Sequence, residues 1–152
     1  FDKQDFTMAA TTGVTNNFRR DLLNGDIDFA ADTFKIALYN NAGHGPTTAA
    51  YSTSNESSGT NYSAGGETLQ NVSITVDASN NVAYVDWATD PSWSTATVTA
   101  DEALIYDDTV SAPTANVACS VHDFNGEKSS SAGTFQIIFP AAAYNTAIIR
   151  LA

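Results

Sequence analysis

The sequence predicts an all-β protein, an antiparallel β-sandwich (Ig-like or jelly-roll-like) with one short N-terminal helix. Three observations favour this fold class. Seven or eight short segments alternate apolar and polar residues with period two, turn-forming residues separate them roughly every 8–12 positions, and only one segment has helical spacing. Because the expected strands are not interleaved with helices, a parallel α/β sheet is not expected.

The single expected helix covers residues 14–24. Phe18 and Leu22 recur at a spacing of four and form an apolar face, whereas the charged residues 19–21 occupy the other face. Thr15 or Asn16 caps its start, and the Asn-Gly pair at 24–25 stops it. A helix of about ten residues needs tertiary packing to be stable, so we expect it to be an accessory to the fold.

The expected strands follow one another along the rest of the chain. A turn at residues 77–81 joins two of them into a hairpin. The strands are expected at 34–39, 72–77, 82–87, 95–100, 103–106, 117–124, 135–139 and 147–151. They belong to one sandwich domain, residues 14–152, which residues 1–13 precede as an N-terminal arm.

Residues 40–66 form the longest connection. Gly, Ser, Thr, Asn and Ala dominate it, and Tyr51 and Tyr62 are its only large apolar residues. A connection of this length is either functional or covered by a neighbouring molecule, and a short edge strand can lie near Tyr51. The two tyrosines are therefore candidate partner-interface residues.

Charge and composition exclude several classes of protein. The chain has 152 residues, 6 basic against 17 acidic, and a net charge of −11. Such a surface repels phosphate, so no nucleic-acid partner is expected. The longest apolar run, residues 135–144, contains Gln136 and Pro140, so no membrane span is expected. Cys119 is the only cysteine and cannot form an internal disulfide.

The residues that carry enzyme chemistry are sparse. His44 and His122 are the only histidines and lack zinc-site spacing, and no Gly-x-Ser-x-Gly elbow is present. The acidic pairs at 26 and 28, 101–102 and 107–108 are interpreted as solvated turn acids, with calcium ligation as the alternative. We therefore expect a protein that is not an enzyme, with no catalytic residues, no metal site and no cofactor.

Four aromatic residues lie on or beside expected strands: Tyr84, Trp87, Trp93 and Tyr106. Their positions favour packing in the core or at a contact between subunits. A sugar-stacking platform is the alternative.

The order of several sequence blocks resembles small virion proteins of tailed bacteriophages. The resemblance covers roughly residues 15–151, and it depends on the order and spacing of the blocks together. The blocks are NFRRDLLNGDID at 17–28, DTFKIALY at 32–39, GTNYSAGG at 59–66, WSTATVTA at 93–100, ALIY at 103–106, FNGEK at 124–128 and GTF at 133–135. Residues 1–13 precede the shared region.

The resemblance implies a non-enzymatic virion component, most plausibly a capsid decoration (cement) protein on the outer capsid surface. It would bind the major capsid protein and itself, with a trimer favoured. The acidic charge also favours the exterior over a lumen filled with DNA. The alternatives are a tail or neck component of the virion and a carbohydrate-binding module used in host adhesion.

Two further groups of residues are expected at interfaces. In the arm, Phe1, Phe6 and Met8 dock on a neighbouring subunit or on the capsid, or else fold back on the sandwich. The final strand carries Ile148 and Ile149, which we expect inside the sandwich or at a subunit contact.

Overall fold

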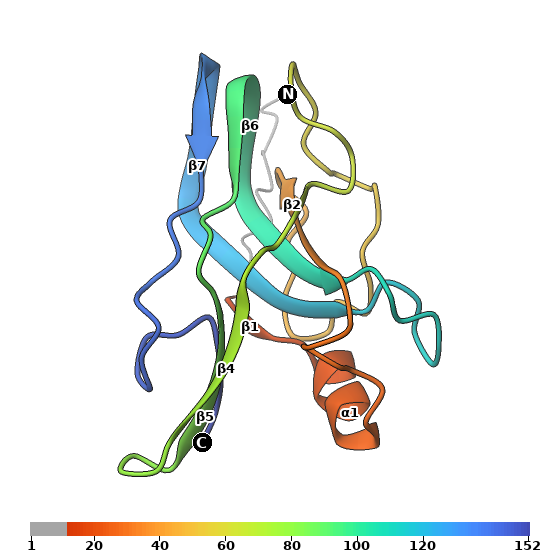
Figure 1. Cartoon of the computed structure of the whole chain (residues 1–152). Helices are drawn as coiled ribbons and strands as arrows, with labels where there is room; N and C mark the ends of the chain where they lie inside the picture. Colours follow the sequence, from red (N-terminus) through yellow and green to blue (C-terminus); the bar gives the residue numbers. More distant parts are fainter. Residues whose placement is uncertain (1–11) are drawn as a thin grey trace, which may run out of the picture.

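The structure is a computed structural model that describes residues 12–152. Its strands form two antiparallel sheets that share a core, with helix α1 (Asn16–Asn24) beside them (Figure 1). The larger sheet has the order β1 (Gly13–Val14), β7 (Ala118–Gln136), β6 (Ser92–Asp107), β2 (Phe34–Tyr39) and β3 (Glu67–Thr68). The smaller sheet has the order β4 (Val72–Asp77), β5 (Val82–Trp87) and β8 (Ile149–Leu151). The predicted all-β sandwich with one short N-terminal helix is confirmed.

Helix α1 begins and ends where its capping residues predict. The Thr15 hydroxyl accepts the Phe18 N–H at 3.2 Å, and Gly25 closes the helix with a φ of 80°. Phe18 is buried, as the spacing predicts. The placement of Asp21 on the solvent side was wrong, because its carboxylate is buried and accepts the Arg20 Nε at 2.6 Å.

Strands β6 and β7 form one long, bent hairpin, in which they run side by side over their whole length (Figure 1). The expectation of four shorter strands in this part of the chain was wrong. Residues that indicated turns are bulges within the ladder. Between the pairs Ala100–Lys128 and Glu102–Asp123, for example, the β7 residues 124–127 oppose Asp101 alone. Such bulges bend a strand without ending it.

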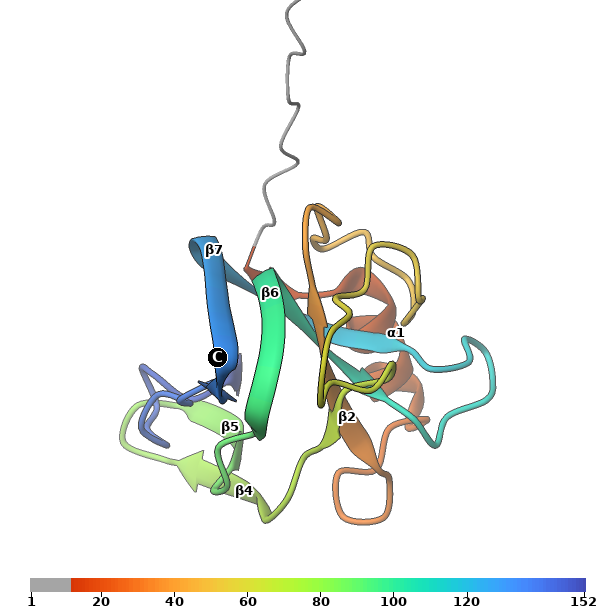
Figure 2. The ribbon, with the colours of Figure 1, turned by 90° about the horizontal axis from the view of Figure 1, so that it is seen from above.

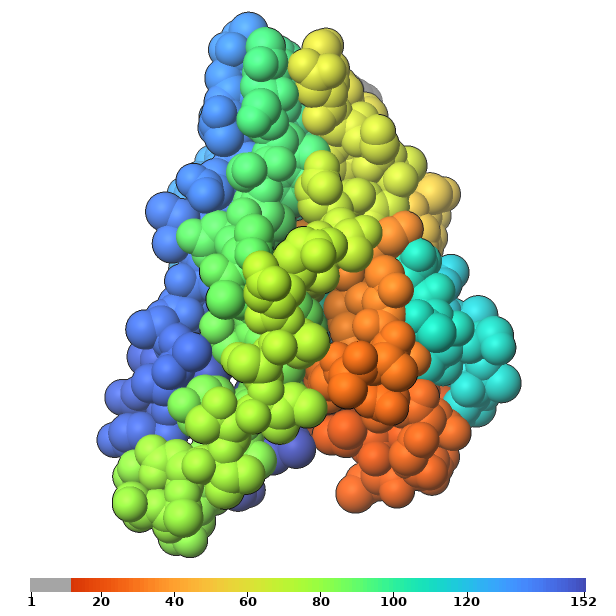
Figure 3. Space-filling model, viewed as in Figure 1, coloured from red at the N-terminus to blue at the C-terminus, as the bar shows by residue number. Residues whose placement is uncertain are grey.

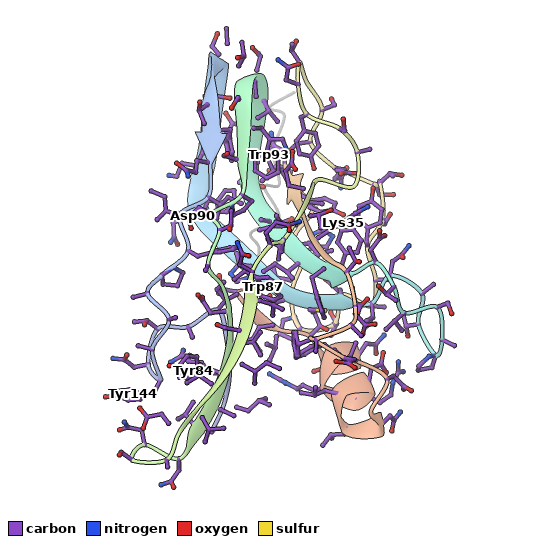
Figure 4. All side chains as sticks on the ribbon, in the orientation of Figure 1. Lys35, Tyr84, Trp87, Asp90, Trp93 and Tyr144 are labelled. Carbon is purple, nitrogen blue, oxygen red and sulfur yellow. The ribbon has the colours of Figure 1, made fainter. Side chains whose placement is uncertain are left out.

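The core between the sheets is built on stacked aromatic rings. Phe29 lies parallel to Phe34, with ring centroids 4.8 Å apart, and Phe34 packs against Trp87 at 5.6 Å. Trp87 reaches this cluster from β5, near the middle of the molecule (Figure 4). Phe18 adds helix α1 to the same cluster through an edge contact with Phe29. The expectation that Trp87 belongs to the core is confirmed.

Residues 40–66 cover the outer face of the larger sheet. Beneath them lies a second buried apolar cluster that includes Tyr39, Leu104, Tyr106 and Val121. The connection contains no strand of its own, although Ala50 forms an isolated bridge with Val117. The larger sheet is thus buried on both faces where β2, β6 and β7 meet.

Two glycines allow this connection to lie close to the sheet. A Cβ atom on Gly66 would stand 1.8 Å from the Ile36 carbonyl oxygen, and Gly66 has a φ of +70°. A Cβ atom on Gly59 would stand 1.9 Å from the Thr97 carbonyl oxygen. Since only glycine fits such close backbone contacts, these two positions hold the connection against β2 and β6.

Candidate interaction surface

The predicted interface residues Tyr51 and Tyr62 meet at one carboxylate. The Tyr51 hydroxyl donates to Glu56 Oε2 at 2.7 Å, and the Tyr62 hydroxyl donates to Glu56 Oε1 at 2.9 Å. Tyr62 also accepts the buried Leu38 N–H at 2.9 Å. Burial raises the pKa of both phenols above the ordinary value for tyrosine, so both stay protonated as donors.

The same cluster fastens the connection to β6. The ring of Tyr51 stacks on that of Tyr106 with centroids 4.5 Å apart, and the Tyr106 hydroxyl donates to the Gly65 carbonyl at 2.9 Å. Tyr51 and Tyr62 therefore hold residues 40–66 in place within the chain. Whether they also contact a partner stays a prediction.

A second attachment joins the connection to β6 through a buried acid. Glu102 is buried, and its Oε2 accepts the His44 backbone N–H at 3.2 Å. The His44 ring also lies near this acid, with Nδ1 3.2 Å from Glu102 Oε1. Glu102 is thus not the solvated turn acid expected from the sequence.

The other candidate chemical groups serve local structure. Ser120 and His122 form a hydrogen bond of 2.9 Å on β7, and burial lowers the pKa of His122 to about 4. Asp107 is buried and accepts the N–H groups of Thr109 and Val110, and its burial raises its pKa to about 6. Asp107 is therefore not a solvated turn acid either. Within residues 12–152, no three His, Cys, Asp or Glu side chains are grouped to hold a metal ion.

The predicted residues of the final strand belong to the smaller sheet, whereas Tyr51 packs against the larger one. Ile149 is buried in the smaller sheet, and Ile148 packs partly against the same core. The expectation that this strand is buried within the sandwich is confirmed for Ile149. Phe1, Phe6 and Met8 lie outside the described residues.

Exposed apolar side chains gather on the smaller sheet. The β4 residues Val72, Ile74 and Val76 are exposed, with Ile74 at 59% and Val76 at 72%. Leu151 at the end of β8 is also exposed, and it lies on the same face because Leu151 and Val76 both pair with Ala83 of β5.

A cleft of about 290 Å³ separates the helix from the smaller sheet. Leu22, Ile27 and Phe29 line one side, and Ile74, Val85 and Leu151 line the other. Figure 3 shows the molecule hollowed at this place, between the light-green β4–β5 hairpin and the orange-red helix. Apolar clefts bordered by exposed apolar residues are typical of sites that bind another protein.

This surface was only partly predicted. The alternation of Val72, Ile74 and Val76 predicts a strand with one apolar face, and the structure confirms that strand. The alternation does not reveal that the strand is at a sheet edge, because the edge depends on pairing partners far away in the sequence. For this reason, none of the interface residues predicted from the sequence lies on β4.

Helix α1 has nine residues, and residues 12–152 contain no helix able to cross a membrane. Comparison with known proteins finds no matching family model, no matching curated protein and no matching solved structure.

Proposed function

We propose that the chain is a non-enzymatic structural protein of a bacteriophage virion, acting as a capsid decoration protein on the outer capsid surface. The observation that carries this proposal is the exposed apolar surface formed by Ile74, Val76 and Leu151 on a strongly acidic chain. Contiguous apolar surface of this kind marks a protein contact. The resemblance of the sequence blocks to virion proteins supports the choice of particle.

Charge supports the position on the particle. A net charge of −11 opposes contact with packaged DNA. In addition, two of the described basic side chains form ion pairs with acidic side chains of the same chain. Arg20 forms an ion pair with Asp21, and the Lys35 Nζ atom lies 2.8 Å from Asp108 Oδ2. An acidic protein with an apolar contact surface suits the outside of a shell.

The number of copies per particle tests the proposal. The protein would be measured in purified virions by gel densitometry against the major capsid protein. Hundreds of copies per virion support a decoration protein, whereas a copy number that fits a single ring of subunits supports the tail or neck alternative. Absence from the particle overturns both.

A binding measurement tests the surface. Cosedimentation with undecorated capsids should fall at least about tenfold for the double variant Val76→Glu, Leu151→Glu, since both residues lie on this face of the smaller sheet. The matched control is Ile138→Glu, because Ile138 is 76% exposed but lies outside this surface. Equal binding by the double variant and the control would place the capsid contact elsewhere.

A polar groove supports the carbohydrate-binding alternative. It has a volume of about 520 Å³, and its lining includes Asn40, Asn55, Glu56, Thr60 and Thr97. Amide, hydroxyl and carboxylate groups are suited to sugar hydroxyls. Glycan-array binding that Thr60→Ala and Asn55→Ala abolish would support this function, and an array without signal would leave only the virion role.

A further inference from the structure

Strand β4 is an edge strand without the usual protection. The smaller sheet ends at β4, which lies at the outer border of the molecule with β5 behind it (Figure 2). Its sequence, VSITVD, contains neither lysine nor proline, and none of its residues is buried. Natural proteins shorten, charge or cover such edges, because exposed strand edges pair with other strands.

The free backbone groups of β4 belong to three residues. The Ala88 N–H donates to the Asn71 carbonyl at 3.1 Å, one step beyond the pair Val72–Trp87. In an antiparallel ladder the direction of these groups alternates along the strand. Val72, Ile74 and Val76 therefore direct both N–H and C=O away from β5, toward the open edge.

The side chains of β4 match a second copy of the same strand. In an antiparallel pair centred on Ile74, that residue faces its own copy and Val72 faces Val76. The polar residues Ser73 and Thr75 face each other on the opposite side of the sheet. Every apolar side chain thus meets an apolar one, and all three outward residues find hydrogen-bonding partners.

Charge agrees with this register. The one ionisable residue of β4, Asp77, lies opposite Asn71 of the second copy. The two Asp77 carboxylates are six residues apart along the strand, or about 20 Å. Since the Debye length is about 8 Å at physiological ionic strength, their mutual repulsion is small.

We propose that β4 is a self-association surface, through which two copies pair antiparallel about a two-fold axis at Ile74. The two smaller sheets become one continuous sheet with the order β8-β5-β4-β4-β5-β8. Ile74 and Val76 extend the apolar face of the sheet across the junction. This arrangement differs from the trimer that the sequence resemblance implies.

The expected affinity is low. One six-residue strand buries less than the roughly 1,200 Å² of the smallest stable protein interfaces. Each copy also carries a charge of −11, and this long-range repulsion opposes association. Sodium chloride screens the repulsion, so dimerisation should strengthen with salt.

Sedimentation equilibrium of the full chain tests the proposal between about 10 µM and 1 mM. A monomer–dimer equilibrium is expected, and Ile74→Lys should raise its dissociation constant at least about tenfold. The control Ile138→Lys should leave it unchanged. Because residue 74 faces its own copy, mixing Ile74→Lys with Ile74→Glu should restore dimers that neither variant forms alone.

Cysteine cross-linking tests the register. With oxidised glutathione, Ile74→Cys should form a covalent dimer, since facing Cα atoms of a hydrogen-bonded pair lie about 5.5 Å apart. Thr75→Cys should not, because Thr75 faces Ser73 of the second copy. Val72→Cys and Val76→Cys should cross-link only when mixed. Native Cys119 is buried and should not interfere.

Two outcomes overturn the proposal. One is a chain that stays monomeric up to about 1 mM at every salt concentration. The other is an oligomer, trimeric or not, in which Ile74→Cys cross-links no faster than Thr75→Cys.

Discussion

Ile74 and Val85 lie directly opposite each other on the inner face of the β4–β5 hairpin, yet Ile74 is 59% exposed and Val85 is 5% exposed. The core of the sandwich therefore ends between two neighbouring strands. The inner face of β5 carries Val85 and Trp87, which belong to the buried core, whereas the inner face of β4 extends past that core. An apolar sheet face without cover is a surface available to a partner.

This difference predicts unequal effects of two truncations. Val85→Ala removes buried methyl groups and should lower the free energy of unfolding by about 1–3 kcal/mol. Ile74→Ala should lower it by less than about 1 kcal/mol, through strand propensity alone. Urea unfolding at low protein concentration measures both. Equal losses there would mean that Ile74 is covered within the single chain.

The tyrosine cluster predicts a loss of stability from removing one oxygen atom. Tyr62→Phe leaves the buried Leu38 N–H without an acceptor and takes one donor from Glu56. We expect a loss of about 1–3 kcal/mol in the free energy of unfolding. Tyr144→Phe is the control, because the Tyr144 ring is partly exposed. If both variants unfold at the same denaturant concentration, the cluster does not hold the connection.

Local signals predicted the helix and the β4–β5 hairpin well. Thr15 and Gly25 cap the helix through backbone groups of the helix itself, so both capping roles can be identified from the local sequence. The turn at 77–81 is equally local, and residues 72–77 and 82–87 pair as expected.

Features that depend on distant residues were missed. The Asn125-Gly126 pair suggests a turn that ends a strand. In the structure, β7 pairs with β6 on both sides of this pair, so the two residues form a bulge within one continuous strand. Similarly, Glu102 is adjacent to Asp101 and looks like a solvated acid. It is buried because residues 40–66 bring His44 onto it. Neither partner can be identified from the local sequence.

Buried Asp107 and partly buried His122 predict opposing effects of pH on stability. Burial raises the pKa of Asp107 from 3.8 to about 6, so the folded state takes up its proton before the unfolded state does. The resulting stabilisation is complete below about pH 4 and is lost as pH rises through 6. Replacing the acid with Asp107→Asn keeps an acceptor for Thr109 and Val110 and should remove this dependence.

The contribution of His122 to stability depends on pH in the opposite direction. Burial lowers its pKa from 6.5 to about 4, so its stabilisation is complete above pH 6.5 and is lost as pH falls through 4. Each group contributes about 1–3 kcal/mol, and the two effects partly cancel in the native chain. Urea unfolding between about pH 4 and 7 should therefore show a shallow native profile. Asp107→Asn should lose stability on acidification and His122→Gln should gain it. Parallel profiles for the two variants would contradict this assignment.

Thr15 predicts a separation between two conservative substitutions. Its buried hydroxyl accepts the Phe18 N–H and donates to the Ala118 carbonyl, so one oxygen atom joins the start of α1 to β7. Thr15→Ser keeps both hydrogen bonds and should cost less than about 1 kcal/mol. Thr15→Val keeps the shape of the side chain but leaves a buried donor and a buried acceptor unpaired, so it should cost about 2–4 kcal/mol. Urea unfolding of the two variants measures the difference directly, because their side chains differ from threonine by one methyl group or one hydroxyl group. If Thr15→Val is as stable as Thr15→Ser, the helix is held to the sheet by Phe18 packing and not by the cap.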